Sequence, residues 1–175
     1  EFRNLKTFAT LSPIPGYRQW LDEKLSANIP ALLSEEESST LSTAAPADLP
    51  APDTGAEALF AILGRRGWHR DPVMVRAVEP VIVRLCARYL LTESNPKHPK
   101  RAKDGVAHFH LFNGARIERI NMLADTSERG IRESAALMVN YLYDPARIEE
   151  NHEDYAGEGK RNASPAVRRL ARGSG

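Results

Sequence analysis

A short strand-like segment that stops at a proline-rich turn is the feature that most limits how this chain folds. Leu5 to Leu11 (LKTFATL) carries Thr, Phe and Leu with partial alternation, which predicts a buried strand. The Pro13-Ile14-Pro15-Gly16 run predicts a tight loop, so Ser12 lies at the end of the strand. From Tyr17 to about Ser26, apolar residues recur at helical spacing. We therefore expect a strand, a tight loop and a helix in succession.

The length and composition are those of one ordinary globular domain, with 175 residues, 42% hydrophobic and 27% charged. They exclude a disordered, collagen-like or disulfide-scaffold protein. No apolar run approaches the roughly 20 residues needed to cross a bilayer, so no membrane association is expected. A net charge of +1 gives no global field for nucleic acid, and no nucleic-acid partner is expected. The single Cys86 lies in an apolar run, which predicts a structural thiol in a reducing compartment.

Polar and apolar segments alternate through the middle of the chain. Residues 34–54 are rich in Ser, Thr, Ala, Pro and acidic residues without a hydrophobic period, and predict a flexible surface loop. Gly55 to Arg66 predicts a short amphipathic helix. Asp71-Pro72 is a strong helix start, and apolar residues continue through Leu91. We expect Pro80 to kink or split that helix.

A local excess of positive charge follows in Thr92 to Asp104. The segment is polar and contains two prolines, which favours a solvated basic loop. Its basic residues are Lys97, Lys100, Arg101 and Lys103.

Two structures are open for Gly105 to Ile120. Asn113-Gly114 between apolar stretches is typical of a hairpin turn. Alternatively, Gly114 ends a short helix that begins at Asp104. The residues alone do not choose between the two.

The last part of the chain contains one more strand-like segment and a tail. Leu137 to Tyr143 is rich in β-formers and ends at Asp144-Pro145, which predicts a buried strand. We expect residues 145–175 to form a C-terminal tail with one short helix. That helix starts at Ser164-Pro165 and runs through Leu170.

The common catalytic and metal-binding motifs are missing from the sequence. It has no glycine-rich phosphate loop, no zinc-type Cys/His spacing and no G-x-S-x-G elbow. His108 and His110 are two residues apart without a third convergent ligand, so no metal is expected. Ser12 and His110 form a possible hydroxyl and imidazole pair. Taken alone, these residues favour a turn serine and a core histidine.

Four blocks of the sequence carry a resemblance to a known family. The first contains S-P-I-P-G-x-x-x-W-L, and the blocks are TLSPIPGYRQWL (Thr10 to Leu21), RLCARYL (Arg84 to Leu90), VAHFHLFNGARIERINMLAD (Val106 to Asp125) and GIRESAALMVNYLYD (Gly130 to Asp144). In these blocks and in their order, the chain resembles the malonyl-CoA decarboxylases. The resemblance covers most of Phe2 to Asp144.

This resemblance implies an α/β fold of the N-acetyltransferase-like (GNAT) type, a mixed sheet flanked by helices. Residues 1–175 would be only the C-terminal portion of the catalytic domain, after a helical domain and the first half of the catalytic domain. The GNAT architecture favours a short helix at Val106 to Phe112 and a strand after Gly114. His108 and His110 would then lie on different faces of that helix.

The resemblance also implies which residues act. Ser12 and His110 match the family's catalytic, substrate-binding pair, and Tyr143 matches a tyrosine associated with that site. The implied reaction converts malonyl-CoA to acetyl-CoA and carbon dioxide. The thioester carbonyl accepts the electrons as an enolate, so no cofactor is implied. His110 suits a general acid, because an ordinary imidazole has a pKa of about 6.5.

Further expectations concern partners and location. The resemblance implies malonyl-CoA as substrate and a homo-oligomer in the full-length protein, and the basic residues of the 97–103 segment are candidates to attract CoA phosphates. The composition suits a cytoplasmic bacterial protein. The alternatives are a GNAT-type acyltransferase, a polyketide-type acyl-thioester decarboxylase, or a non-catalytic CoA-binding module.

Overall fold

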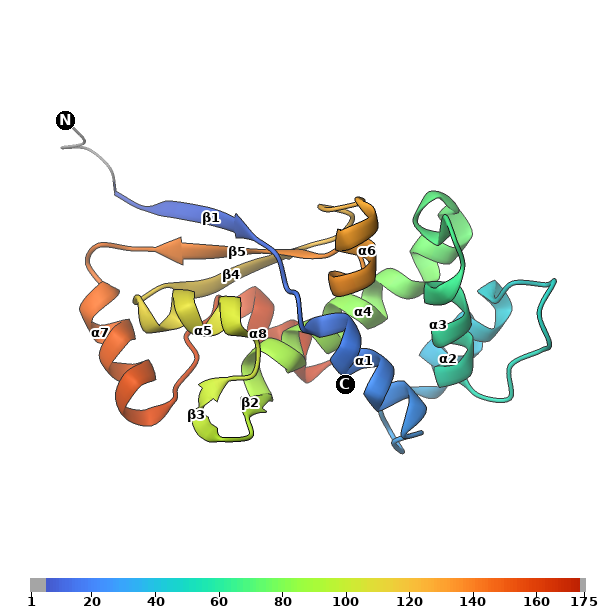
Figure 1. Ribbon diagram of the computed structural model, residues 1–175, viewed down its shortest axis with the longest axis horizontal. Helices are drawn as coiled ribbons and strands as arrows, with labels where there is room; N and C mark the ends of the chain where they lie inside the picture. Colours follow the sequence, from blue (N-terminus) through green and yellow to red (C-terminus); the bar gives the residue numbers. More distant parts are fainter. Residues whose placement is uncertain (1–5, 174–175) are drawn as a thin grey trace.

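The computed structural model describes residues 6–173 and has a mixed α/β architecture (Figure 1). A strand, β1, is followed by helices, then by a hairpin and a second set of alternating helices and strands. The strands are β1 (Phe8–Ser12), β2 (Ser94–Asn95), β3 (His98–Ala102), β4 (Arg116–Asn121) and β5 (Met138–Tyr143). The α-helices are α1 (Tyr17–Ser26), α2 (Glu35–Ala44), α3 (Gly55–Gly64), α4 (Pro72–Thr92), α5 (Gly105–Phe112), α6 (Glu128–Ser134), α7 (Ile148–Glu153) and α8 (Pro165–Arg172). A 3₁₀ turn covers Trp68–Arg70, and a π-helical turn covers Asp154–Glu158.

The sheet that organises the fold has the strand order β1-β5-β4. Strand β5 runs antiparallel to both neighbours, so among the described strands the expected mixed sheet is an antiparallel one. The register pairs Thr10 with Tyr141 and Ser12 with Val139. Because side chains alternate along a strand, these residues share one face of the sheet. Helix α5 lies along the sheet, and α2 and α3 lie at the far end of the molecule (Figure 1).

The first strand and helix lie where the sequence predicted them, but the expected burial of the strand is wrong. Phe8 and Leu11 are 44% and 54% exposed, because β1 is at the edge of the described sheet. Strand β1 ends at Ser12, and the part of the predicted strand at Leu5 lies outside the described residues. Helix α1 spans Tyr17–Ser26, as its apolar spacing indicated. Trp20 and Leu21 of this helix are buried in the core. The strand-loop-helix order is therefore confirmed.

Helix α4 is the longest helix of the described structure and begins where the sequence predicted. The carboxylate of Asp71 accepts hydrogen bonds from Val73 N and Met74 N, which satisfies two free amides of the first turn. The helix is continuous through Pro80, so of the two expected outcomes, a kink or a split, the split is wrong. Val78 and Ile82, on either side of the proline, are both fully buried. Burial in one common core holds the two halves together.

The prediction of a flexible loop at 34–54 is wrong for its first half, which is helix α2. Ser34 and Glu37 form a capping box, in which each side chain accepts a hydrogen bond from the other residue's backbone N–H. Leu41 is fully buried, and Glu37 pairs with Arg84 of α4 at 2.8 Å. The polar composition did not predict this helix, because only Leu41 and Ala44 of α2 are buried and its start is marked only by the capping box.

The basic loop predicted for Thr92 to Asp104 is instead the β2–β3 hairpin. The side chain of Asn95 accepts a hydrogen bond from Lys97 N and shapes the turn. The backbone N–H of Lys103 donates to Glu93 O and closes the base of the hairpin. The prediction missed the hairpin because its strands are held by backbone hydrogen bonds, and such a polar segment has no sequence pattern typical of strands.

The open question at Gly105 to Ile120 is settled in favour of a helix followed by a strand. Asp104 caps α5 by accepting hydrogen bonds from Val106 N and Ala107 N. Gly114 has φ +86° and turns the chain into β4. This is the left-handed region, which glycine adopts without steric cost.

The expected C-terminal tail is packed structure rather than a tail. Helix α8 begins after Ser164, which caps it, as predicted. Helix α7 and the π-helical turn were not expected. Tyr155 and Val167 are both buried in the core, and Ala163 forms a bridge with Ile117 of β4. These contacts fix the segment against the sheet.

The structure also tests the expectations of a structural thiol at Cys86 and of no membrane-spanning segment. Cys86 is fully buried within α4, in agreement with a structural thiol, and burial raises the pKa of this thiol. Between residues 6 and 173, no helix combines the length and the apolar character that crossing a membrane requires.

Candidate active site

The hydroxyl of Ser12 and the imidazole of His110 are in direct contact. Ser12 Oγ lies 3.1 Å from His110 Nε2, within hydrogen-bond distance. Ser12 is the last residue of β1, and His110 is in the last turn of α5. Both side chains are buried, with 6% and 8% of their surface exposed. The fold therefore brings together the two residues that the sequence suggested as a pair.

Tyr143 and Thr10 extend this contact on either side. The phenol oxygen of Tyr143 lies 2.7 Å from His110 Nδ1. The hydroxyl of Thr10 lies 3.1 Å from that of Ser12. Thr10, Ser12, His110 and Tyr143 thus form one chain of three hydrogen bonds that crosses two strands and a helix. Ser12 and the neutral imidazole of His110 can each donate one hydrogen bond and accept another. All three hydrogen bonds can therefore form with their donors pointing either toward Thr10 or toward Tyr143.

Aromatic rings surround the imidazole and fix its plane. The ring of Tyr141 stacks on His110 with centroids 4.3 Å apart and an interplanar angle of 16°. Phe109 meets the imidazole edge-on at 5.2 Å. Phe8 stacks on Tyr143 at 4.8 Å. The imidazole is thereby held between the sheet and its own helix, which limits its rotation.

Burial sets the protonation states of these groups. Loss of hydration lowers the pKa of His110 below its ordinary value of about 6.5, because the charged form is disfavoured. Burial likewise raises the pKa of the Tyr143 phenol. At neutral pH the site therefore holds a neutral imidazole beside a protonated phenol. Neither group carries a permanent charge before a ligand arrives.

The loop after Ser12 is anchored to two other elements. Ser134 of α6 donates its hydroxyl to Ile14 O and accepts a hydrogen bond from Ile14 N. Asp104, the cap of α5, also accepts from Gly16 N at 3.4 Å. A Cβ at Gly16 would lie only 2.5 Å from the hydroxyl of Tyr89, so the close approach needs glycine there.

Asp104 therefore connects the two halves of the site. Its one carboxylate contacts the turn that follows Ser12 and the first turn of the helix that carries His110. Burial raises the pKa of Asp104, and the backbone N–H groups that it accepts from oppose this shift. The carboxylate is thus a buried link whose hydrogen bonds offset only part of its desolvation.

His108 lies away from this site, as expected for a residue about 200° around the helix from His110. Its Nδ1 contacts the phenol oxygen of Tyr155 at 2.8 Å, on the side of the hairpin. In the described part of the chain, no three His, Cys, Asp or Glu side chains are grouped so that they could hold a metal ion.

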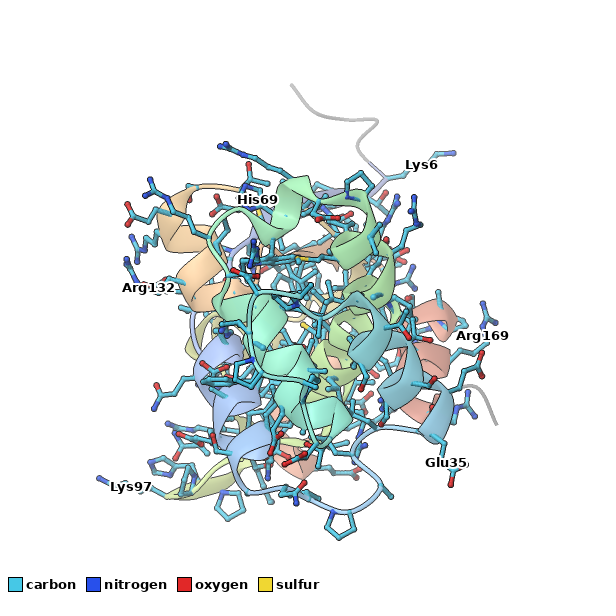
Figure 2. All side chains as sticks on the ribbon, turned by 90° about the vertical axis from the view of Figure 1, so that its right-hand side faces the viewer. Lys6, Glu35, His69, Lys97, Arg132 and Arg169 are labelled. Carbon is cyan, nitrogen blue, oxygen red and sulfur yellow. The ribbon has the colours of Figure 1, made fainter. Side chains whose placement is uncertain are left out.

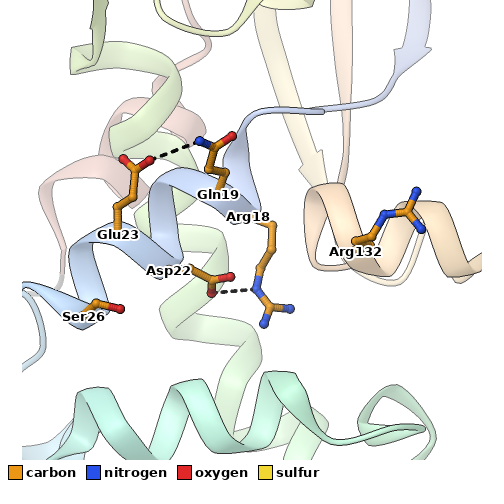
Figure 3. Close-up of a pocket in the computed structure, with 6 residues that line it drawn as sticks. All are labelled: Arg18, Gln19, Asp22, Glu23, Ser26 and Arg132. Carbon is orange, nitrogen blue, oxygen red and sulfur yellow. Dashed lines mark hydrogen bonds and ion pairs between the residues drawn. The ribbon is translucent and has the colours of Figure 1, made fainter.

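A separate hollow lies between α1 and α6, with a volume of about 460 Å³ (Figure 3). Four of its residues form two pairs within α1, Arg18 with Asp22 at 2.8 Å and Gln19 with Glu23 at 3.2 Å. Arg132 of α6 also lines the hollow. Arg18 and Asp22 compensate each other's charge, and the hollow contains none of the Ser12 chain. It offers no chemistry that the sequence suggested.

Two site residues were missed by sequence reasoning. Thr10 and Tyr141 each lie two positions before a candidate, Ser12 and Tyr143, on the same strand. Since the side-chain period of a strand is two, they share a face with that candidate. This period was the signal that could have identified them.

Comparison with known proteins agrees with the geometry. The family model for the malonyl-CoA decarboxylase C-terminal domain matches residues 1–175. The curated mitochondrial malonyl-CoA decarboxylase of the goose Anser anser anser is 37% identical over 172 residues, covering 95% of this chain and 32% of its own length. That of the rat, Rattus norvegicus, is 36% identical over 170 residues, covering 95% and 33%. The chain thus spans about a third of the length of these curated relatives.

Solved structures give the same result. The crystal structure of malonyl-CoA decarboxylase from Rhodopseudomonas palustris has a TM-score of 0.78 and 36% identity, covering 94% of this chain and 33% of that chain. The enzyme from Agrobacterium vitis has a TM-score of 0.76 and 38% identity, covering 97% and 36%. By family match over its whole length, by identity and by fold, this chain belongs to the malonyl-CoA decarboxylase family, as a C-terminal domain.

Proposed function

We propose that this chain is the C-terminal portion of an enzyme that decarboxylates malonyl-CoA to acetyl-CoA and carbon dioxide. The single observation that carries the proposal is the 3.1 Å contact between Ser12 Oγ and His110 Nε2 in a chain of this family. A hydroxyl and an imidazole held together in a buried, aromatic surrounding can bind a carboxylate and move a proton. Those are the two tasks that this reaction sets.

The substrate supplies its own electron sink. When the bond to the carboxylate breaks, the electron pair moves into the neighbouring thioester carbonyl and forms an enolate. Carbon dioxide leaves, and the enolate carbon then takes up one proton to give acetyl-CoA. The protein has to align the breaking bond with the carbonyl and deliver that proton.

His110 is the proton donor in this scheme. Its imidazole is neutral in the empty site, because burial lowers its pKa. The malonyl carboxylate brings a negative charge into the site, so the imidazole takes up a proton from solvent and becomes an imidazolium. The imidazolium gives its proton to the enolate carbon and returns to the neutral form, so the charge and the atoms balance.

Ser12 and Tyr143 hold the reacting groups in place. The Ser12 hydroxyl contacts His110 Nε2 and provides a neutral hydrogen-bonding group at the position where the carboxylate or the enolate oxygen would bind. Tyr143 contacts the opposite nitrogen and fixes the ring orientation. Tyr143 is therefore a positioning residue in this proposal.

The fold and the setting of the protein are part of the same proposal. We infer that the β1-β5-β4 sheet is the C-terminal portion of a GNAT-like sheet, supported by the helices that flank it. The homo-oligomer and the cytoplasmic location stay predictions. The curated relatives are named as mitochondrial proteins.

The decisive experiment adds malonyl-CoA to the full-length protein and measures acetyl-CoA by mass spectrometry. We expect turnover, and a loss of about 10²-fold or more in His110→Ala. His152→Ala is the matched control, because this partly buried histidine on α7 is outside the Ser12 chain. No turnover by the full-length protein, or equal turnover by His110→Ala, contradicts the assignment. Transfer of the acyl group to an added amine would instead identify an acyltransferase, and CoA binding without turnover would identify a binding module.

A further inference from the structure

We propose that the pocket between the β2–β3 hairpin, α5 and the π-helical turn binds a phosphorylated nucleotide. The pocket has a volume of about 500 Å³, in the range of small-molecule sites. The lining residues that matter here are Lys97, Lys100, Arg101, His108, Phe112 and Tyr155. They combine positive charge on one side with aromatic rings on the other.

The positive side is not neutralised within the protein. Within residues 6–173, neither Lys97, Lys100 nor Arg101 has a carboxylate oxygen within 4.0 Å. Lys97 extends away from the body of the protein (Figure 2). Lys100 donates to Gly157 O at 2.6 Å, which joins the hairpin to the π-helical turn. Cations that share a concave site without counter-charges suit a ligand with several phosphate oxygens.

The aromatic side offers flat surfaces for a base. The centroid of the His108 ring lies 5.7 Å from that of Tyr155 and 5.9 Å from that of Phe112. Phe112 leaves 47% of its surface exposed on the described structure. A nucleotide base can stack on an exposed ring of this kind.

This wall is rigid. The phenol oxygen of Tyr155 accepts a hydrogen bond from Ala102 N at 2.9 Å and contacts His108 Nδ1 at 2.8 Å. The two bonds tie the end of β3 and the face of α5 to the π-helical turn. A preformed wall lowers the conformational entropy lost when a ligand binds.

The pocket and the Ser12 site share helix α5 but face its opposite sides. His108 points into the pocket, whereas His110 contacts Ser12. Two sources of the nucleotide fit this arrangement. One is the nucleotide end of the CoA thioester, reaching around the helix, and the other is a separate nucleotide. The choice of adenine probes rests on the proposed function.

The test titrates adenosine 3′,5′-bisphosphate into the full-length protein and follows the heat of binding. We expect saturable binding that weakens by about 10-fold or more in Lys97→Gln/Arg101→Gln, because two charge-assisted contacts are lost. Lys103→Gln is the matched control for charge, since it is on the same hairpin arm but outside the pocket lining. Phe112→Leu should weaken binding, and Phe60→Leu, a phenylalanine of similar exposure on α3, should not.

Further measurements distinguish the CoA end from a separate nucleotide, and distinguish the pocket proposal from the proposed decarboxylase activity. Inorganic phosphate should bind more weakly than the bisphosphate. If the bisphosphate raises the KM for malonyl-CoA without changing kcat, the site holds the CoA end, and if it changes kcat alone, it holds a separate nucleotide. The binding readout does not need turnover, so it stands even if the enzyme assignment fails. If the bisphosphate does not bind saturably, or if Lys103→Gln weakens its binding equally, the proposal that this pocket binds a nucleotide is wrong.

Discussion

Ser12 Oγ and His110 Nε2 lie 3.1 Å apart, although 98 positions separate the two residues in the sequence. The hydrogen bonds of Asp104 join the turn after Ser12 to the helix that carries His110. The neighbouring Tyr143 and Thr10 continue the contact into one hydrogen-bonded chain. This arrangement leads to the following predictions.

Ser12 and His110 should act as a unit. Ser12→Ala and His110→Gln should each lower kcat by about 10²-fold, and the double variant should be no slower than the slower single variant. Removal of either group leaves the other without its partner, so the two losses overlap. Steady-state kinetics on the full-length protein gives the comparison. Losses that multiply would show that the two residues act independently.

Tyr143→Phe should lower kcat by about fivefold, because it removes one hydrogen bond of about 1 kcal/mol to His110 Nδ1. The ring and its stacking with Phe8 remain. The pH dependence of kcat should shift as well, since the hydroxyl contacts the proton donor directly. Phe8→Leu keeps the hydroxyl and serves as the control. If the pH dependence of kcat is unchanged in Tyr143→Phe, Tyr143 does not position His110.

Substrate binding should take up a proton near neutral pH. The empty site holds a neutral His110, and a bound malonyl carboxylate favours the imidazolium. Calorimetry in two buffers of different ionisation enthalpy, with a malonyl thioester analogue that cannot lose carbon dioxide, measures the uptake. His110→Gln should abolish it. Proton uptake that persists in this variant would place the titrating group elsewhere.

Asp104→Ala should lower both stability and activity. It removes the cap of α5, which costs about 1–2 kcal/mol of the free energy of unfolding, and it releases the turn after Ser12. Asp71→Ala removes the equivalent cap from α4 and is the matched control. We expect similar losses of stability in chemical denaturation but a fall in kcat only for Asp104→Ala. Equal kcat in both variants would limit Asp104 to a structural cap.

Stability should fall on mild acidification. Burial lowers the pKa of His110 and of His108 in the folded protein, so between that lowered pKa and about 6.5 the unfolded chain binds more protons. The contribution of the two histidines is therefore complete above about pH 6.5 and is lost as the pH falls from there through the lowered pKa of the folded protein. Urea unfolding between pH 7.5 and pH 5.5, about one unit either side of the ordinary histidine pKa, measures the effect. The double variant His108→Gln/His110→Gln should flatten this dependence, and an equally steep loss there would exclude these histidines as the cause.

Local signals determined much of the secondary structure. Asp71-Pro72 and Ser164-Pro165 start helices in the structure because a side-chain oxygen satisfies nearby amides of the first turn. Tyr17–Ser26 is a helix because its apolar residues share one side. The capping box of Ser34 and Glu37 was an equally local signal, but the polar composition around it pointed to a loop.

The sequence therefore predicts the segments that are stabilised by hydrogen bonds or apolar contacts between residues a few positions apart. Only the tertiary structure decided that β2 and β3 pair, that the 145–175 segment packs on the core, and that Ser12 meets His110. Each of these depends on contacts between residues distant in the chain. Such contacts form only when burial of a common core outweighs the entropy of closing the long loops between them, and no short stretch of sequence records that balance.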